Sequence, residues 1–146
     1  MMTFPRFELV DHPTNLNYTE KNPHPKKERH GDCGVRAISL ALNIPYEEVW
    51  TEATKIKRQF RGKKSKVTAN YGLGRRELRY TLIALGHGNW KFKSTPNKYF
   101  TLRNLPDICI ALVPGHWTTV KSGEVYDSWD CRGKRLKQLR GYFAPK

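Results

Sequence analysis

The sequence contains no long hydrophobic run. Its mean hydropathy is -0.72, and no segment approaches the ~20 apolar residues that a membrane-spanning helix needs. Residues 1–11 hold neither a long apolar stretch nor a small-residue cleavage pattern, so we expect no secretory signal there. No internal repeat or low-complexity stretch interrupts the 146 residues. These absences predict one domain without a membrane segment, long enough to bury a single core.

Cysteine is scarce, with three residues, Cys33, Cys109 and Cys131, at wide spacing. An odd number of distant cysteines argues against a disulfide framework and fits a reducing compartment, so we expect free thiols and a cytoplasmic location. The five histidines and the cysteines also lack the short paired spacings of zinc ligands. We therefore expect no metal site and no cofactor.

Acidic residues are few, because 13 Asp and Glu stand against 27 Lys and Arg, giving a formal net charge of +14. Such an excess is the electrostatic signature of proteins that bind nucleic acid or an acidic partner. The densest basic block spans residues 55–66 and continues after residue 74. Charge alone usually marks a solvated face, so this surface supports only one of two hypotheses. Its candidate contacts are Lys63, Lys64, Lys66, Arg75 and Arg76.

What the sequence does contain is a cysteine at the point where a loop turns into an apolar helix. After Cys33, apolar residues recur at three- and four-residue steps up to residue 42. The first turn of such a helix offers free backbone amides and the positive end of the dipole, which favour the reactive thiolate. We expect Gly31 and Gly34 to leave room for a substrate. A free cysteine is more commonly a small buried hydrophobe, so catalysis requires a base elsewhere.

The segment 116–129 supplies a candidate base and an acid. His116 opens a β-branched run, Ser-Gly at 122–123 predicts a turn, and the residues after it predict the returning strand. Strands of a hairpin lie about 5 Å apart, so Asp127 can approach His116 and fix its tautomer, leaving the other ring nitrogen for the thiol. His87 is the alternative base and Asp130 the alternative acid.

The order Cys, His, Asp, with the cysteine starting a helix and the others on later strands, resembles the papain-like cysteine peptidase superfamily. Asp-Cys-Gly at 32–34 resembles the nucleophile motif of bacteriocin-processing peptidases, and Asp-Ser-Trp at 127–129 is similar to the Asn-Ser-Trp of papain. The pattern is also similar to small papain-fold proteins encoded by bacteriophages. The resemblance implies a catalytic triad of Cys33, His116 and Asp127, with Trp129 shielding the His–Asp hydrogen bond.

One position departs from the family pattern. Papain-like enzymes carry a glutamine about six residues before the nucleophile that helps to bind the oxyanion, and Lys27 stands there in this chain. Either Lys27 takes that role or another donor does, such as the Cys33 amide. Asn22 and His30 are the candidates to assist that amide. If none of these serves, the chemistry is not ordinary peptide hydrolysis.

The expected fold is α+β and papain-like, with N-terminal helices packed on an antiparallel sheet of about four or five strands. Helices are predicted from residue 33 to Asn43, from Pro45 onward, and over 74–85. Strands are predicted at 90–92, 107–113, 116–121 and 124–129, with 132–143 as an edge strand or an amphipathic tail. We expect an extended arm over 1–30, a motif-bearing core over 31–129 and a basic segment over 130–146, all in one domain of residues 1–146.

The function predicted from these residues is a cytoplasmic papain-like cysteine hydrolase, a peptidase or isopeptidase, with a protein or peptide substrate. A thioester-forming acyltransferase would use the same residues, because a dry site with an amine acceptor diverts the acyl group from water. The competing hypothesis is a non-catalytic basic module on the same scaffold that binds nucleic acid or an acidic host protein.

Overall fold

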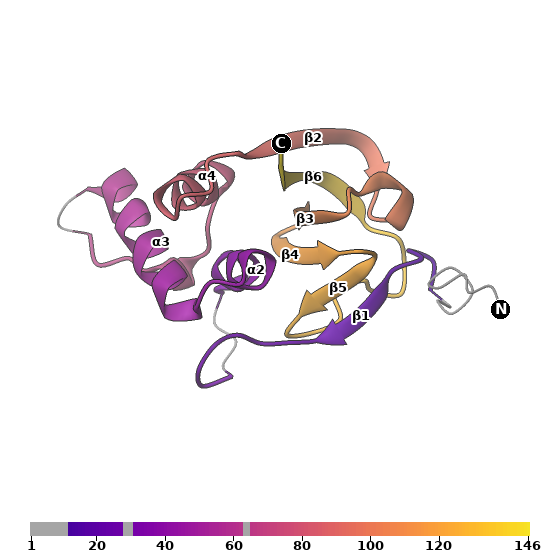
Figure 1. Cartoon of the computed structure of the whole chain (residues 1–146), viewed down its shortest axis with the longest axis horizontal. Helices are drawn as coiled ribbons and strands as arrows, with labels where there is room; N and C mark the ends of the chain where they lie inside the picture. Colours follow the sequence, from indigo (N-terminus) through magenta and orange to yellow (C-terminus); the bar gives the residue numbers. More distant parts are fainter. Residues whose placement is uncertain (1–11, 28–30, 63–64) are drawn as a thin grey trace.

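A mixed six-stranded sheet and three α-helices make up the computed structural model, which describes residues 12–27, 31–62 and 65–146. The helices gather beside one face of the sheet, and α2 lies nearest to its centre (Figure 1). The helices are α2 (Cys33–Leu42), α3 (Tyr46–Arg61) and α4 (Arg75–Ala84), with 3-10 turns at Ala69–Tyr71 and Leu102–Asn104. The strands are β1 (Asn17–Glu20), β2 (Trp90–Tyr99), β3 (Ile108–Val113), β4 (His116–Lys121), β5 (Glu124–Asp127) and β6 (Gln138–Pro145).

The strands lie in the order β1-β5-β4-β3-β6-β2 across the sheet. β1 runs parallel to β5, whereas the other neighbouring pairs are antiparallel. This mixed architecture is compatible with the predicted α+β class. The expectation of a purely antiparallel sheet with four or five strands is wrong, because β1 adds a parallel strand from within the predicted N-terminal arm.

The last two strands on one side of the sheet also differ from their predictions. β2 extends to Tyr99 instead of ending at Phe92, and a register shift between Ser94 and Lys98 interrupts its pairing with β6. The polar residues around that shift break the alternation by which strands are recognised, so the sequence pattern does not predict the second half of β2. β6 is an interior strand between β3 and β2 rather than an edge strand or a tail. The edge on that side is β2.

The central strands form where local patterns predict them. β3, β4 and β5 follow one another through the two-residue turns at 114–115 and 122–123. β3 pairs Val113 with His116 across the first turn, and β4 pairs Lys121 with Glu124 across the second. The apolar run of β3 is therefore confirmed as a central strand. The two turns fix the register that later brings the histidine and the acid together.

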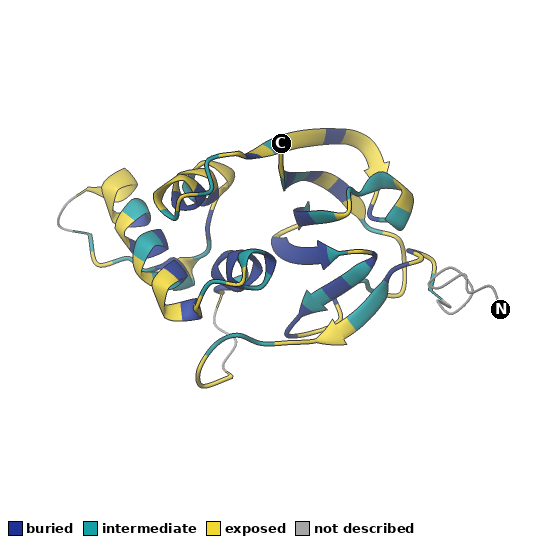
Figure 2. Ribbon diagram, viewed as in Figure 1, coloured by how far each residue is buried: buried dark blue, intermediate teal, exposed yellow. Residues whose placement is uncertain are grey.

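The helix that begins at Cys33 is the most buried helix of the fold. Figure 2 shows that buried residues concentrate in α2 and in the central strands, whereas β2 is largely exposed. Val35 and Ile38 are fully buried against the sheet, and each such side chain contributes about 1.5–3 kcal/mol relative to exposure. Thr119 on β4 donates a hydrogen bond of 2.6 Å to the Ala37 carbonyl. α2 ends at Asn43 in a left-handed conformation, as predicted.

Apolar residues cover both faces of the sheet. One cluster, with Ile110 and Phe143, packs against the helices, and the other, with Val120 and Leu139, fills the opposite face.

Among the described helices, none combines the length and apolarity that crossing a membrane requires.

Candidate active site

The three predicted catalytic residues occupy the ends of three elements. Cys33 is the first residue of α2, His116 the first of β4, and Asp127 the last of β5. Because α2 packs on β4 through Thr119, the helix start and the strand start are held against each other. The side chain of His116 interacts with those of Asp127 and Cys33. The structure thus brings together the three residues that the sequence suggests.

The histidine and the acid form a direct hydrogen bond. His116 Nε2 lies 2.7 Å from Asp127 Oδ2. The β4–β5 register pairs Thr119 with Tyr126. Continued by one residue, it places Asp127 opposite Thr118, so His116 and Asp127 project from the same face. The Thr118 hydroxyl donates to the same carboxylate oxygen at 2.7 Å, and the Ser128 amide donates to the other at 2.7 Å. His116, Thr118 and Ser128 together hold the carboxylate in place. Because the carboxylate bonds Nε2, the other ring nitrogen of His116, Nδ1, can serve the thiol.

The electrostatics of the pair favour its charged form. Burial by itself would lower the pKa of His116, but hydrogen bonding to Asp127, Cys131 and Cys33 and the charge of Asp127 raise it above its ordinary value of 6.5. Burial would raise the pKa of Asp127, yet the hydrogen bond and charge of His116, with the bonds from Thr118 and Ser128, lower it below 3.8. An imidazolium beside an ionised carboxylate is therefore the favoured state.

Trp129 packs beside the imidazole of His116. Its ring centroid is 4.8 Å from that of His116, with a tilt of 51° between the planes. The indole is otherwise exposed, and Lys137 Nζ lies 5.4 Å from its ring. An aromatic ring at this distance excludes water from one side of the imidazole, which strengthens the hydrogen bond behind it.

Cys131 is a site residue that the sequence did not identify. It is completely buried and interacts with the ring of His116. Ligand atoms of Cys131, His116 and Asp127 all lie within 4.8 Å of one another. These are residue types that bind Zn²⁺, although the His–Asp hydrogen bond already occupies one nitrogen and one oxygen. No spacing rule signals the cluster, because its members come from β4, β5 and the loop after β5.

Asp32 anchors the beginning of α2. Its buried carboxylate forms an ion pair with Arg36 and accepts a hydrogen bond of 2.5 Å from the Tyr46 hydroxyl. It makes no side-chain capping bond to the start of α2. The carboxylate therefore leaves the first-turn amides, including that of Cys33, unblocked by a cap. The spacing of Asp32 and Arg36, four residues apart, is the signal from which this pair could have been found.

The glycines beside Cys33 have a different role from the one expected. A Cβ on Gly31 would lie 2.5 Å from the Asn70 carbonyl oxygen, and a Cβ on Gly34 would lie 2.9 Å from a methyl carbon of Leu73. The space over these glycines is filled by the segment that leads into α4, and not left open for a substrate. Their small size lets the chain close against the start of α2.

Asn22 and Lys27, the candidate oxyanion donors, line a cavity that does not include Cys33 among its lining residues. The cavity has a volume of about 830 Å³ and is also lined by Ser39 and Asn43, which belong to the far end of α2 from Cys33. Lys27 Nζ donates to the Asn22 carbonyl at 2.9 Å, and the Asn22 side chain accepts from the His24 amide at 3.0 Å. Both contacts lie within the segment 22–27. His30 lies outside the described residues.

The alternative base and acid have other surroundings. Asp130 is engaged with Arg132, whose Nε and Nη2 lie 2.8 and 2.7 Å from its two oxygens. His87 lies after α4, and its amide donates to the Leu82 carbonyl. Of the contacts between described residues, none joins His87 or Asp130 to Cys33. The hydrogen-bonded pair of His116 and Asp127 is therefore the stronger candidate.

The predicted basic contacts are partly described. Lys63 and Lys64 lie outside the described residues, whereas Lys66, Arg75 and Arg76 are exposed. The two arginines belong to the first turn of α4 and each lies over a phenylalanine ring.

Comparison of the chain with protein-family models, curated proteins and solved structures found no match.

Proposed function

We propose that this protein is a cysteine hydrolase of papain-like fold that cleaves peptide or isopeptide bonds and works in a reducing, cytoplasmic setting. The observation that carries the proposal is the hydrogen bond of 2.7 Å between His116 Nε2 and Asp127, on a ring that also interacts with Cys33. A nucleophile, a base and an orienting acid are the minimum for thiol-based acyl transfer. All three cysteines are free, which suits a thiol nucleophile.

The reaction follows from the positions of these groups. Cys33 Sγ attacks the substrate carbonyl carbon, and its proton is held on His116 Nδ1. The imidazolium donates that proton to the leaving amine as the C–N bond breaks, which leaves a thioester on Cys33. Water then attacks the thioester, His116 accepts its proton and returns it to the sulfur, and the carboxylic acid leaves. Asp127 keeps the ring oriented and stabilises its charge in both halves.

The oxyanion of each tetrahedral intermediate needs donors near Cys33. The amide of Cys33, at the start of α2, is the proposed donor, and it is supported by the engagement of the Asp32 carboxylate with Arg36 and Tyr46 instead of with the helix start. One oxyanion donor contributes about a hundredfold or more in rate. If the second oxyanion donor is weak, a substrate that is oriented by its own backbone contacts would compensate for it.

The proposal is tested by measuring the rate at which iodoacetamide labels each cysteine, read by peptide mass spectrometry, in the wild type, His116→Ala and His87→Ala. We expect Cys33 to react rapidly in the wild type and in His87→Ala, and to react much more slowly in His116→Ala. Cys109 is an internal reference, because burial raises its pKa to about 12. Equal labelling of Cys33 in all three proteins would refute the triad.

Turnover is then tested with a fluorogenic peptide library in the presence of a reductant. The wild type should cleave members that Cys33→Ala does not. Addition of a primary amine tests the acyltransferase variant of the proposal, since transfer would produce an amide of that amine instead of the free acid. If Cys33→Ala retains the full biological effect of the wild type, the non-catalytic module is the correct reading.

A further inference from the structure

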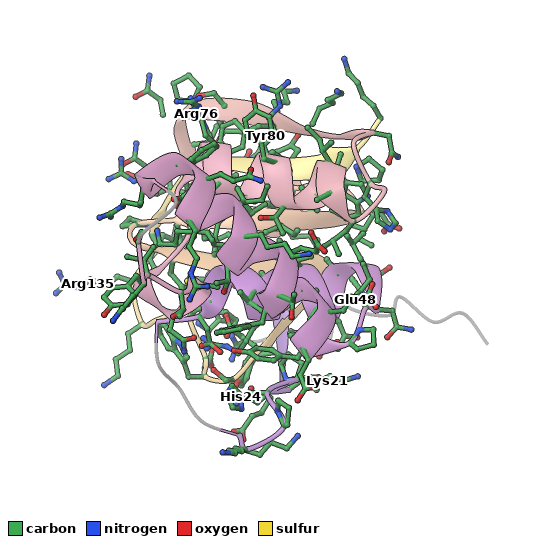
Figure 3. The ribbon with its side chains drawn as sticks, turned by 90° about the vertical axis from the view of Figure 1, so that its left-hand side faces the viewer. Lys21, His24, Glu48, Arg76, Tyr80 and Arg135 are labelled. Carbon is green, nitrogen blue, oxygen red and sulfur yellow. The ribbon has the colours of Figure 1, made fainter. Side chains whose placement is uncertain are left out.

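A second candidate site lies between α4 and the edge strand β2. A hollow of about 300 Å³ is lined there by Arg75, Arg76, Arg79, Lys91, Phe92 and Phe143. We call these six residues the α4–β2 groove. Its lining contains four cations and two phenylalanines and no acidic residue. Figure 3 shows Arg76 and Tyr80 at one end of the molecule, with Lys21 and His24 at the opposite end.

The cations of the groove are not neutralised by neighbouring acids. Of the ion pairs between described residues, none uses Arg75, Arg76, Arg79 or Lys91. The one acid on α4, Glu77, is bound by Lys57 Nζ at 3.1 Å and accepts from the Gly74 amide. All four groove cations are exposed. Uncompensated cations around one hollow attract a ligand with several negative charges.

The floor of the groove is aromatic. Phe92 and Phe143 meet edge to face with centroids 5.1 Å apart, and the Arg75 guanidinium lies 4.6 Å from the Phe92 ring. A Cβ on Gly141 would lie 2.3 Å from Phe92 Cζ. The ring of Phe92 therefore packs on the backbone of Gly141, and the Arg75 guanidinium lies over the ring.

The charge continues beyond the groove. A neighbouring hollow of about 410 Å³ shares Lys91 and Phe92 with it and adds Lys93 and Lys146 on the other side of β2. Cations therefore lie around two adjoining hollows that share Lys91. A ligand with several negative charges along a chain fits this arrangement better than a single small anion.

We propose that the α4–β2 groove binds single-stranded nucleic acid, with phosphates on Arg76, Arg79 and Lys91 and one base stacked on the Arg75–Phe92 pair. Guanidinium groups fit phosphate oxygens in a fork geometry, and bases stack on arginine planes and on aromatic rings. A single strand is favoured because a duplex keeps its bases paired and out of reach of a stacking side chain. This site goes beyond the proposed hydrolase and uses none of its catalytic residues.

The test is the binding of a short labelled oligothymidylate, followed by fluorescence anisotropy over a series of salt concentrations. Arg76→Gln/Arg79→Gln removes two groove cations, and Lys134→Gln/Arg135→Gln removes the same charge outside the groove. We expect the groove variant to reduce the slope of log affinity against log salt by about 1.4, at about 0.7 per lost phosphate contact. The control variant should change the slope far less.

Stacking is tested separately with Arg75→Lys, which keeps the charge but loses the guanidinium plane. We expect affinity to fall at least about fivefold with an unchanged salt slope, because stacking contributes little to counterion release. Thermal melts establish that each variant is folded.

Three outcomes would overturn the proposal. Equal losses in the two double variants would mean that binding follows net charge alone. Equal affinity for a duplex of the same length would mean that no base stacks on the Arg75–Phe92 pair. Displacement of the oligonucleotide by polyglutamate at equal charge concentration would identify an acidic peptide as the ligand. Cys33→Ala should bind like the wild type, so failure of the hydrolase proposal would leave this result intact.

Discussion

The candidate active site and the α4–β2 groove are built on opposite principles. In the active site, His116 and Asp127 are buried and their polar atoms are joined by short hydrogen bonds. In the groove, Arg76 and Arg79 are exposed and no ion pair between described residues neutralises them. A buried pair depends on the identity of each partner, whereas an exposed cationic surface depends on the sum of its charges. Substitutions that change one property at a time test this difference between the two sites.

The largest expected effect is on turnover in Asp127→Asn. The amide keeps the size of the side chain but no longer stabilises an imidazolium, so kcat should fall by about 10³- to 10⁴-fold. Asp130→Asn is the matched control, because that carboxylate is held by Arg132 at the surface, and it should retain nearly full activity. Steady-state kinetics on any cleaved peptide measures both. A larger loss in Asp130→Asn would transfer the orienting role to that residue.

A smaller effect is expected on stability, with a defined pH dependence. The raised pKa of His116 adds stability that is complete below 6.5 and is lost as pH rises through the folded-state pKa. The lowered pKa of Asp127 adds stability that is present above 3.8 and is lost as pH falls through the folded-state pKa. The pair therefore stabilises the fold most between pH 3.8 and 6.5.

Urea unfolding of the wild type and Asp127→Asn at pH 5 and pH 9 measures this dependence. Breaking a buried pair costs about 3 kcal/mol, and we expect the difference between the two proteins to be larger at pH 5. A difference that is the same at both pH values would mean that the two side chains are linked by a neutral hydrogen bond.

The smallest effect is expected for Arg79→Gln in the groove. Because the arginine is exposed and forms no ion pair with another described residue, the free energy of unfolding should change by no more than about 0.5 kcal/mol. Chemical denaturation at low and high salt measures it. Destabilisation above about 1 kcal/mol would indicate that the groove is part of the packing, and the contrast with the active site would then fail.

The sequence predicted most of what depends on neighbouring residues. The apolar run of β3, the two turns and the β-branched run of β4 are local signals, and they were sufficient to place His116 near Asp127. The end of α2 at Asn43 followed from the left-handed preference of that residue. These parts agree because local propensity and the tertiary fold favour the same structure.

The rest depends on contacts between distant segments. β1 is four mostly polar residues long and is stabilised by pairing with β5, so no alternation reveals it. Cys131 meets His116 only after the chain has folded back past β5. The sequence indicated Arg75 and Arg76 as basic contacts. The floor of the groove forms only when β2 and β6 pair, because that pairing brings Phe92 next to Phe143. Such features are invisible until the sheet order is known.

The parallel pairing of β1 with β5 has a consequence for the rate of folding. The bond between His116 and Asp127 spans 11 residues, whereas the Thr119–Ala37 bond spans 82 and the Tyr18–Asp127 bond spans 109. Contacts between distant residues form slowly because a long loop must close first. His116 and Asp127 are therefore expected to pair early within the hairpin, Cys33 to join them later with α2, and β1 to add last. A chain that is still folding would form the His116–Asp127 pair before Cys33 reaches it.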